Sequence, residues 1–231
     1  MKLNKHIPNT ITCLNLYSGI MAVISAYNAD YKMTLIFVLF SAIFDFFDGL
    51  FARWLKVFSP MGKELDSLAD VISFGLVPGM VAFSLLKPLS ETYFVLPYFA
   101  FVITVFSALR LAKFNIDERQ SSSFIGLATP ANALFWVALA FEYASKSNNP
   151  TFLWIVFVSC FVSAFLLVCE LPMFSFKMKS VKWKDAYQQI TFLVGVLLLL
   201  LCFQIAGVYY SIIWYVFLSL IFYRKNIKKT S

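Results

Sequence analysis

Charged residues are scarce in this sequence. Only 13% of the 231 residues are charged, whereas 61% are hydrophobic. Such a composition indicates a polytopic membrane protein and leaves no room for a separate soluble domain. The net charge of +7 is attributed to lysines and arginines at the ends of membrane helices, so nucleic-acid binding is not implied.

Cysteine and histidine are too few, and too scattered, for several kinds of site. The four cysteines stand singly in apolar stretches, at Cys13, Cys160, Cys169 and Cys202. Without CxxC pairs they indicate neither a disulfide framework nor a zinc site. The single histidine, His6, is expected at the surface rather than in a ligand set.

The first apolar stretch does not have the pattern of a cleavable signal peptide. It contains polar residues such as Asn9 and Thr12, and it lacks a clear small-residue cleavage site. We therefore expect this stretch to remain as the first membrane helix.

Eight apolar stretches approach or reach membrane-spanning length. They lie at about 9–27, 33–55, 65–86, 92–112, 129–144, 151–171, 187–205 and 208–223. The last two are short, and a merged or re-entrant final hairpin would leave six crossings. We expect one all-α transmembrane bundle of about eight helices over residues 1–231, with a core at about 1–171 and a C-terminal helical hairpin at about 187–223.

The placement of the basic residues predicts the orientation of these helices. With eight crossings, only Lys32, Lys87 and Lys146 of the 19 Lys and Arg residues fall on the side opposite to the termini. Basic loops stay in the cytoplasm. Both termini are therefore predicted to be cytoplasmic, in the cell (inner) membrane.

One segment concentrates acids in this apolar chain. Residues 45–70 read DFFDGLFARWLKVFSPMGKELDSLAD, which is DxxDGxxAR followed after eight residues by GxxxDxxxD. On helices, Asp45 and Asp48 share one face at i and i+3, and Asp66 and Asp70 share another at i and i+4. If the chain reverses between them, around Ser59, the two faces oppose each other.

Four converging carboxylates at membrane depth need a compensating charge. Asp45, Asp48, Asp66 and Asp70 would repel one another strongly, and buried charges in membrane helices usually mark function. Oxygen ligands favour hard ions, so the group predicts two divalent cations, Mg²⁺ or Mn²⁺, with Ca²⁺ as the alternative. Their depth, near the cytoplasmic headgroups, suits phosphoryl-type transfer to or from a lipid.

The same residues match the motif of a known family. Asp45, Asp48, Gly49, Ala52, Arg53, Gly62, Asp66 and Asp70 are similar, position for position, to the motif of the CDP-alcohol phosphatidyltransferases, integral enzymes that displace CMP from a CDP-activated lipid. The segments IPNTITCLNLYSG at the start, GKELDSLADVISFGLVPG at 62–79, LRLAKFN at 109–115 and GLATPANA at 126–133 resemble the membrane-embedded phosphatidylserine synthases of bacteria and archaea. The resemblance covers about the first 135 residues. Ala128 stands where that pattern has proline.

The resemblance implies a reaction and a set of roles. CDP-diacylglycerol and L-serine would give phosphatidylserine and CMP, in a homodimer surrounded by membrane lipids. Asp45, Asp48 and Asp66 would hold the metal pair, and Asp70 would complete it and act as the catalytic base for the serine hydroxyl. The candidates for contacts to the CDP-lipid are Asn9, Thr12, Gly49, Ala52, Arg53, Gly62 and Lys63.

Recognition of serine requires further polar residues, because a zwitterion needs a donor for its carboxylate and an acceptor for its ammonium. The candidates near the cytoplasmic ends of helices four and five are Arg110, Lys113, Asn115, Thr129 and Asn132, with Arg110 first. Alternative interpretations are topology signalling for Lys113, helix capping for Asn115 and Thr129, and snorkelling for Lys63. Glu170 is expected to pair with a nearby lysine.

Three other functions are compatible with parts of the pattern. A sister enzyme using glycerol 3-phosphate or inositol phosphate would share the acidic motif, and an archaetidylserine synthase would differ only in the lipid. An ion or metal transporter could also place carboxylates in its membrane helices. It would have little need for the GxxAR element, or for acids confined to one leaflet.

Overall fold

The described part of the chain forms eight helical rods. The computed structural model describes residues 6–57, 59–117, 124–146, 149–173 and 183–230. Five rods are single helices: α1 (His6–Tyr27), α2 (Tyr31–Trp54), α7 (Pro150–Val168), α8 (Trp183–Phe203) and α9 (Ala206–Thr230). The third rod is composite and consists of α3 (Pro60–Asp70), a π-helical segment (Val71–Leu76), α4 (Val77–Leu86) and a 3₁₀ segment (Lys87–Glu91). The fourth rod is a 3₁₀ segment (Leu96–Phe101) followed by α5 (Val102–Ile116), and the fifth is α6 (Thr129–Tyr143) followed by a 3₁₀ turn (Ala144–Lys146). The expected all-α bundle is confirmed.

Six of these rods are long and apolar enough to cross a membrane. The two shorter ones are α6, with 15 residues, and the apolar part of α8, Gln189–Phe203. Large apolar side chains such as Phe165 and Leu201 are 65% and 71% exposed. An aqueous surface would not tolerate so many of them, so the outer faces of the rods suit lipid.

Several helix boundaries differ from the predicted ones, and two of the differences have local reasons. The third rod begins at Pro60, not at about 65, because Ser59 Oγ accepts the Gly62 N–H at 3.0 Å and caps the helix. The C-terminal hairpin turns at Gln204, whose φ is 50°. A Cβ at Gly207 would lie 2.5 Å from the Leu199 carbonyl oxygen, so the glycine lets α9 fold back closely on α8.

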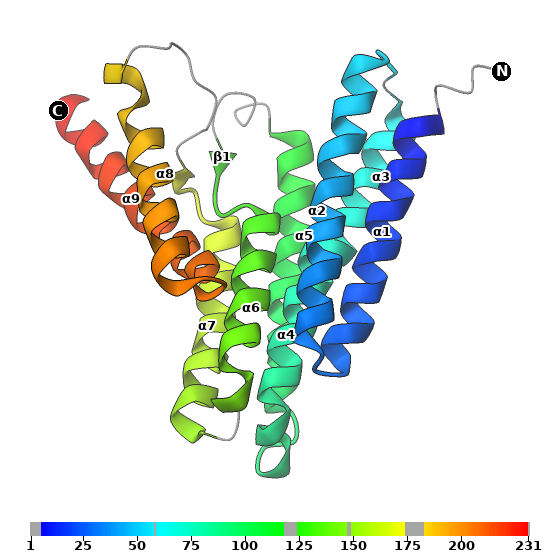
Figure 1. Ribbon diagram of the computed structural model, residues 1–231, viewed down its shortest axis with the longest axis vertical. Coiled ribbons are helices and arrows are strands. Elements are labelled where there is room, and N and C mark those ends of the chain that lie inside the picture. Colours follow the sequence, from blue (N-terminus) through cyan, green and yellow to red (C-terminus); the bar gives the residue numbers. More distant parts are fainter. Residues whose placement is uncertain (1–5, 58, 118–123, 147–148, 174–182, 231) are drawn as a thin grey trace.

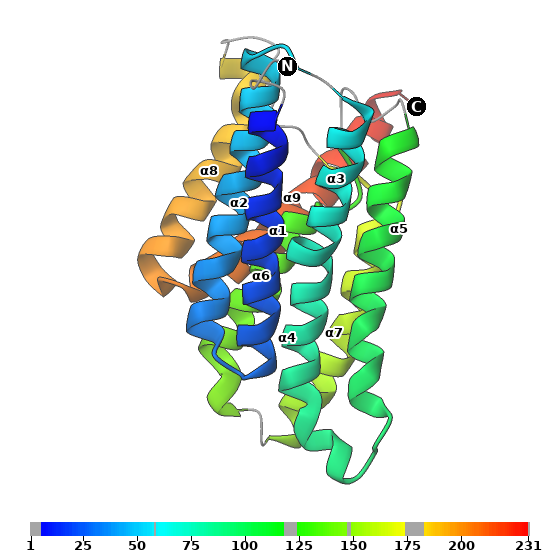
Figure 2. The ribbon, with the colours of Figure 1, turned by 90° about the vertical axis from the view of Figure 1, so that its right-hand side faces the viewer.

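The bundle places both helical ends of the chain at one end of the molecule. The start of α1 and the end of α9 both lie at the top, on opposite sides, whereas the α1–α2 and α6–α7 turns lie toward the bottom (Figure 1). The same arrangement is seen from the side (Figure 2). This parity agrees with an even number of crossings, as predicted.

The core lies between α4, α5, α6 and α7. Its largest fully buried side chains include Phe74, Leu85, Ile103 and Trp136. A two-stranded antiparallel ladder joins the entrance of α6 to the exit of α7, with β1 (Phe124–Ile125) pairing with β2 (Pro172–Met173). The C-terminal hairpin is attached through α9, whose Ala206 and Tyr209 pack on Ala138 of α6.

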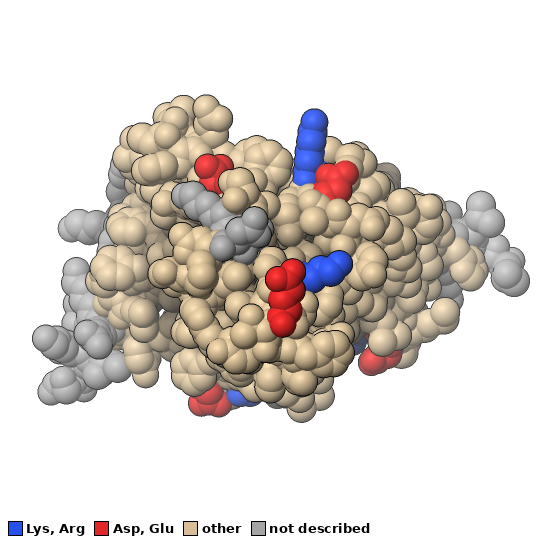
Figure 3. Space-filling model, turned by 90° about the horizontal axis from the view of Figure 1, so that it is seen from below, with Lys and Arg blue, Asp and Glu red and all other residues tan. Residues whose placement is uncertain are grey.

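The end of the bundle opposite to the chain termini carries few charged side chains. It is almost entirely uncharged, with isolated acidic and basic groups (Figure 3). The basic residues predicted in segments 1–5, 118–123 and 174–182 lie outside the described residues, as does the side chain of Lys146.

Gly126 provides a test of how α6 is attached to α7. Its φ is +73°, its N–H donates to the Leu171 carbonyl at 2.9 Å, and a Cβ there would lie 2.6 Å from the Leu167 carbonyl oxygen. Gly126→Ala should therefore destabilise the fold by about 1–3 kcal/mol, measured as a lower Tm in detergent. Gly49→Ala is the control, because no atom lies within 4 Å of its added Cβ. Equal Tm values for the two variants would contradict this packing.

Candidate active site

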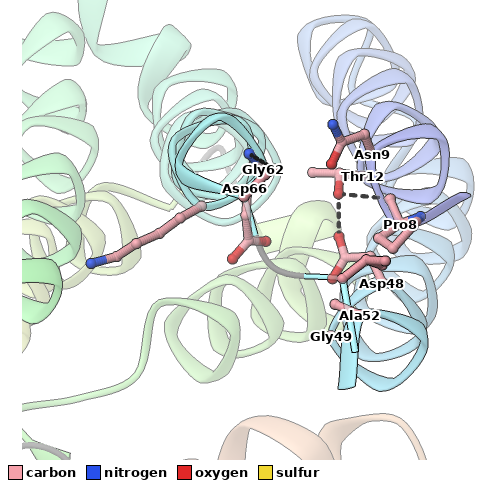
Figure 4. A pocket seen from close by; sticks show the side chains of 11 residues that line it. Pro8, Asn9, Thr12, Asp48, Gly49, Ala52, Gly62 and Asp66 are labelled. Carbon is pink, nitrogen blue, oxygen red and sulfur yellow. Dashed lines mark hydrogen bonds between the residues drawn. The ribbon is translucent and has the colours of Figure 1, made fainter. Parts of the chain in front are cut away.

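Three carboxylates from two helices converge at one point. Asp45 and Asp48 come from α2 and Asp66 from α3, and each offers an oxygen within 4.8 Å of the others. The chain reverses between the helices through Lys56, whose φ is 53°, and the Ser59 cap. Asp48 and Asp66 face each other across the gap (Figure 4). The predicted opposition of the two acidic faces is therefore present for these three residues.

This group has the properties of a site for hard cations. Asp66 Oδ1 is buried and has no hydrogen-bond partner among the described residues, and Asp48 is only 6% exposed. A buried acceptor without a donor is costly, and carboxylates this close repel one another. A divalent cation bound between them relieves both costs, and all the donors are the oxygen atoms that Mg²⁺, Mn²⁺ and Ca²⁺ prefer.

Thr12 of α1 supports the acidic group from the side. Its hydroxyl lies 2.7 Å from Asp48 Oδ2 and 3.0 Å from the Pro8 carbonyl oxygen, and it is 3% exposed (Figure 4). A hydroxyl proton directed at one carboxylate oxygen fixes the rotation of that carboxylate. Such supporting contacts tune metal ligands.

Asp70 lies at the edge of the group, with its side chain in hydrogen-bond reach of Asp45. It is not among the residues whose oxygens come within 4.8 Å of one another. Its Oδ1 instead accepts from the Asn15 amide nitrogen at 3.3 Å, although it is close enough to interact electrostatically with Asp45, Asp66 and Asp48. The site thus consists of a group of three acids and a fourth acid held by an amide.

A pocket opens beside the three acids. Its volume is about 210 Å³, and it is lined by Pro8, Asn9, Thr12, Asp48, Gly49, Ala52, Val57, Ser59, Gly62, Lys63 and Asp66. Six of the seven residues predicted to contact the CDP-lipid therefore line one cavity. The exception is Arg53, which is exposed and outside this lining.

The two glycines of the pocket act differently. A Cβ at Gly49 would meet no atom within 4 Å, so this glycine leaves the wall of the pocket open. A Cβ at Gly62 would lie 3.0 Å from Asn9 Oδ1, so that glycine permits close packing of α3 on α1. Lys63 extends away from both and donates from Nζ to the Asn115 carbonyl at 3.0 Å.

Of the residues predicted to bind serine, Arg110 and Thr129 lie together. Arg110 is 7% exposed, and its Nη1 donates to Thr129 Oγ1 at 3.2 Å. The Phe114 ring lies 5.4 Å from the guanidinium carbon, and Asp70 is within electrostatic range. Arg110 Nε is buried without a hydrogen-bond partner in the described part of the chain. An unused donor therefore remains close to the acids.

Lys113 and Asn115 have other partners. Lys113 Nζ lies 3.3 Å from Glu170 Oε1, which confirms that Glu170 pairs with a lysine. Asn115 Nδ2 donates to Ser67 Oγ at 2.7 Å and so ties α5 to α3. The structure does not bring these two residues to Arg110.

Asn132 belongs to a buried network between α6 and α7. Trp136 Nε1 donates to Ser163 Oγ at 3.1 Å, and that hydroxyl donates to Asn132 Oδ1. The Asn132 amide nitrogen has no partner among the described residues. Asn132 lies on the same helix as Thr129, but its amide oxygen binds Ser163, whereas Thr129 binds Arg110.

Sequence reasoning missed three polar residues of this region. Asn15 and Ser73 are fully buried, and Ser73 donates to Asn15 Oδ1 at 2.7 Å. Tyr215 of α9 interacts electrostatically with Arg110. A signal for Asn15 existed, because it follows Asn9 and Thr12 at helical spacing on one face of α1. Ser73 and Tyr215 carried no such pattern.

Fold and site together define a polytopic membrane protein in which a group of carboxylates that could hold a metal ion lies beside a small pocket. The family model for CDP-alcohol phosphatidyltransferase matches residues 5–222. The chain belongs to this family. The family expected from the motif is thus confirmed.

Several relatives carry the same name, CDP-diacylglycerol–serine O-phosphatidyltransferase. The chain is 35% identical to one from Bacillus subtilis over 142 residues, 60% of this chain and 77% of the relative. It is 32% identical to one from Helicobacter pylori over 189 residues, 76% of this chain and 74% of the relative. It is 31% identical to one from Saccharomyces cerevisiae over 157 residues, 61% of this chain and 55% of the relative.

The contact between Thr12 and Asp48 generates a prediction about cation affinity. Thr12→Val removes the hydroxyl but keeps the shape, so Mn²⁺ should bind about 10-fold more weakly, measured by titration of the purified protein in detergent. Thr12→Ser should retain the affinity. Thr10→Ala is the matched control, because the Thr10 hydroxyl is exposed and bonds only to the His6 carbonyl. Equal Mn²⁺ affinity in Thr12→Val and Thr10→Ala would show that Thr12 does not support the ligands.

Proposed function

We propose that this chain transfers the phosphatidyl group from CDP-diacylglycerol to the hydroxyl of L-serine and releases CMP. The observation that carries the proposal is the convergence of Asp45, Asp48 and Asp66 beside the pocket. Relatives named for this reaction, at 31–35% identity, support the choice of donor and acceptor.

The reaction exchanges a phosphoanhydride bond for a phosphoester bond. A bond forms between the serine oxygen and the phosphorus next to diacylglycerol. The bond from that phosphorus to the bridging oxygen of the pyrophosphate breaks, and CMP leaves with the electron pair. Two divalent cations, when bound by the acids, polarise the phosphoryl oxygens and stabilise the charge on the leaving group.

The pocket residues are proposed to hold the nucleotide end of the donor. Asn9 and Thr12 offer polar contacts, and Lys63 offers a positive charge. The small residues Gly49 and Ala52 leave space for the nucleotide to approach the helix. Gly62 keeps α3 close to α1. Arg53, exposed beyond the lining, would reach only a phosphate that lies outside the pocket.

Asp70 is proposed as the base. A serine hydroxyl is a poor nucleophile at neutral pH, and a carboxylate in hydrogen-bond reach can take its proton as the new bond forms. Asp70 is suited to this role because it lies beside the three acids without being part of their group. It would also complete the cation site on that side.

Arg110 is proposed to bind the serine carboxylate. Its guanidinium lies near Asp70 and keeps an unpaired Nε donor. Thr129, in contact with Arg110, would orient it, and Asn132 offers a second free donor on α6. Lys113 and Asn115, which bind Glu170 and Ser67, would hold the surrounding helices.

The setting is proposed to be the cytoplasmic face of the cell membrane. The donor's chains would lie in lipid, its diphosphate at the acids, and serine would arrive from the cytosol. The whole chain would act as one domain, with the core at about 1–171 and the hairpin at about 187–223, which the family match over 5–222 supports. A homodimer is the expected assembly.

The first test compares acceptors. Purified protein given CDP-diacylglycerol with Mg²⁺ or Mn²⁺ should release CMP with L-serine and not with glycerol 3-phosphate or inositol phosphate. Excess chelator should abolish release, and Asp70→Asn should lower kcat at least about 100-fold because the base is lost. CMP release is measured by chromatography.

Each other outcome of that assay names a different function. Release with glycerol 3-phosphate or inositol phosphate alone would indicate a sister enzyme, and a preference for archaeal ether lipid an archaetidylserine synthase. Cation transport without consumption of CDP-diacylglycerol would indicate a transporter. Full activity in excess chelator would contradict the cation site.

Arg110 allows serine recognition to be tested separately from the chemistry. Arg110→Ala should raise the KM for serine about 10-fold or more, because a charge-assisted contact of roughly 1.5–3 kcal/mol is lost, with a much smaller effect on the KM for CDP-diacylglycerol. Lys113→Ala is the matched control, one turn away on α5, and should leave both KM values unchanged. An unchanged serine KM in Arg110→Ala would remove Arg110 from the pocket.

A further inference from the structure

Two hydrogen bonds link Ser73 and Asp70, which both lie on the third rod, through Asn15 of α1. Asn15 is fully buried. Its amide nitrogen donates to Asp70 Oδ1 at 3.3 Å, and its amide oxygen accepts from Ser73 Oγ at 2.7 Å. Each end of the amide therefore has one specific partner.

The chemistry of the partners determines how the amide is oriented. A carboxylate oxygen accepts hydrogen bonds, so it suits the –NH₂ end of Asn15, which lies against Asp70. The oxygen end then faces Ser73, whose hydroxyl supplies a proton to it. Ser73 thus prevents the amide from rotating, and the amide in turn restrains the carboxylate.

The backbone is built to bring Ser73 to this position. Ser73 lies in the π-helical segment Val71–Leu76, which begins directly after Asp70. A Cβ at Gly19 would lie 2.4 Å from Ser73 Oγ and 2.9 Å from its Cα, so α1 can approach only through a glycine. Single π-helical turns are frequent at functional sites, because they shift side chains out of α-helical register.

We propose that Asn15 and Ser73 are positioning residues for Asp70. They hold Oδ1 and so present Oδ2 to the acceptor hydroxyl, while Asp45, Asp48 and Asp66 remain free to bind cations. This inference rests on the proposed function, because it assigns a task within that reaction. It predicts that the amide affects the rate of transfer far more than the affinity for cation or donor, because Asp45, Asp48 and Asp66 keep their places.

The chain offers a matched control at the same residue. Ser41 of α2 is fully buried and donates to the backbone carbonyl of Asn15 at 3.2 Å. Ser41→Ala therefore removes a buried hydroxyl bonded to Asn15 without touching the side-chain amide. Ser73→Ala removes the hydroxyl that orients the amide.

The experiment compares Asn15→Leu, Ser73→Ala and Ser41→Ala with the unchanged chain. Asn15→Leu should lower kcat for CMP release at least about 10-fold, the range for contacts that orient a working group, and Ser73→Ala should lower it by a smaller factor. In both, the KM for CDP-diacylglycerol and the Kd for Mn²⁺, measured without substrate, should stay within about threefold. Ser41→Ala should resemble the unchanged chain in all three quantities.

Three outcomes would overturn the proposal. They are an unchanged kcat in Asn15→Leu, a loss of Mn²⁺ affinity that parallels the loss of kcat, and equal effects of Ser73→Ala and Ser41→Ala. If Asn15→Leu does not fold, the comparison of the two serine variants decides alone. Absence of CMP release from the unchanged chain with every acceptor would instead refute the proposed function.

Discussion

Repulsion among carboxylates inside an apolar bundle is the constraint on which the rest of the structure depends. Asp45, Asp48 and Asp66 are held within 4.8 Å of one another, in rods whose outer faces suit lipid. Such a group is stable only if cations bind in it or its charge is lost. The repulsion arises because the turn between α2 and α3, with the Ser59 cap at the start of α3, leaves the two acidic faces opposed.

The remaining polar residues are arranged around that group. The buried face of α1 carries Thr12, which contacts Asp48, and Asn15, which contacts Asp70. On the other side, Arg110 brings a buried positive charge near Asp70. The acids therefore lie between the neutral donors of α1 and the guanidinium of Arg110. The proposed nucleotide pocket is on the α1 side of the acids, and the proposed serine pocket is on the Arg110 side.

The fold and the acidic group could be predicted from sequence because both depend on periodicity. The length of the apolar stretches predicts the helical rods, and the i, i+3 and i, i+4 spacings predict that the acids of each helix share a face. Polar partners across helices were harder to predict. Lys113 and Asn115 have the depth expected of serine contacts, yet Glu170 and Ser67 bind them. Arg53 is exposed and is not among the residues that line the pocket. Spacing along one helix does not specify which residue of another helix faces it. The π-helical segment after Asp70 also turns Ser73 to a face of the rod that a regular 3.6-residue period does not predict.

The most direct test of the central claim is anomalous diffraction from crystals of this protein soaked in Mn²⁺. The account predicts anomalous density between the carboxylates of Asp45, Asp48 and Asp66, with their oxygens at about 2.0–2.3 Å from the metal. Side chains of those three residues that point apart, with anomalous density elsewhere or none at all, would contradict it.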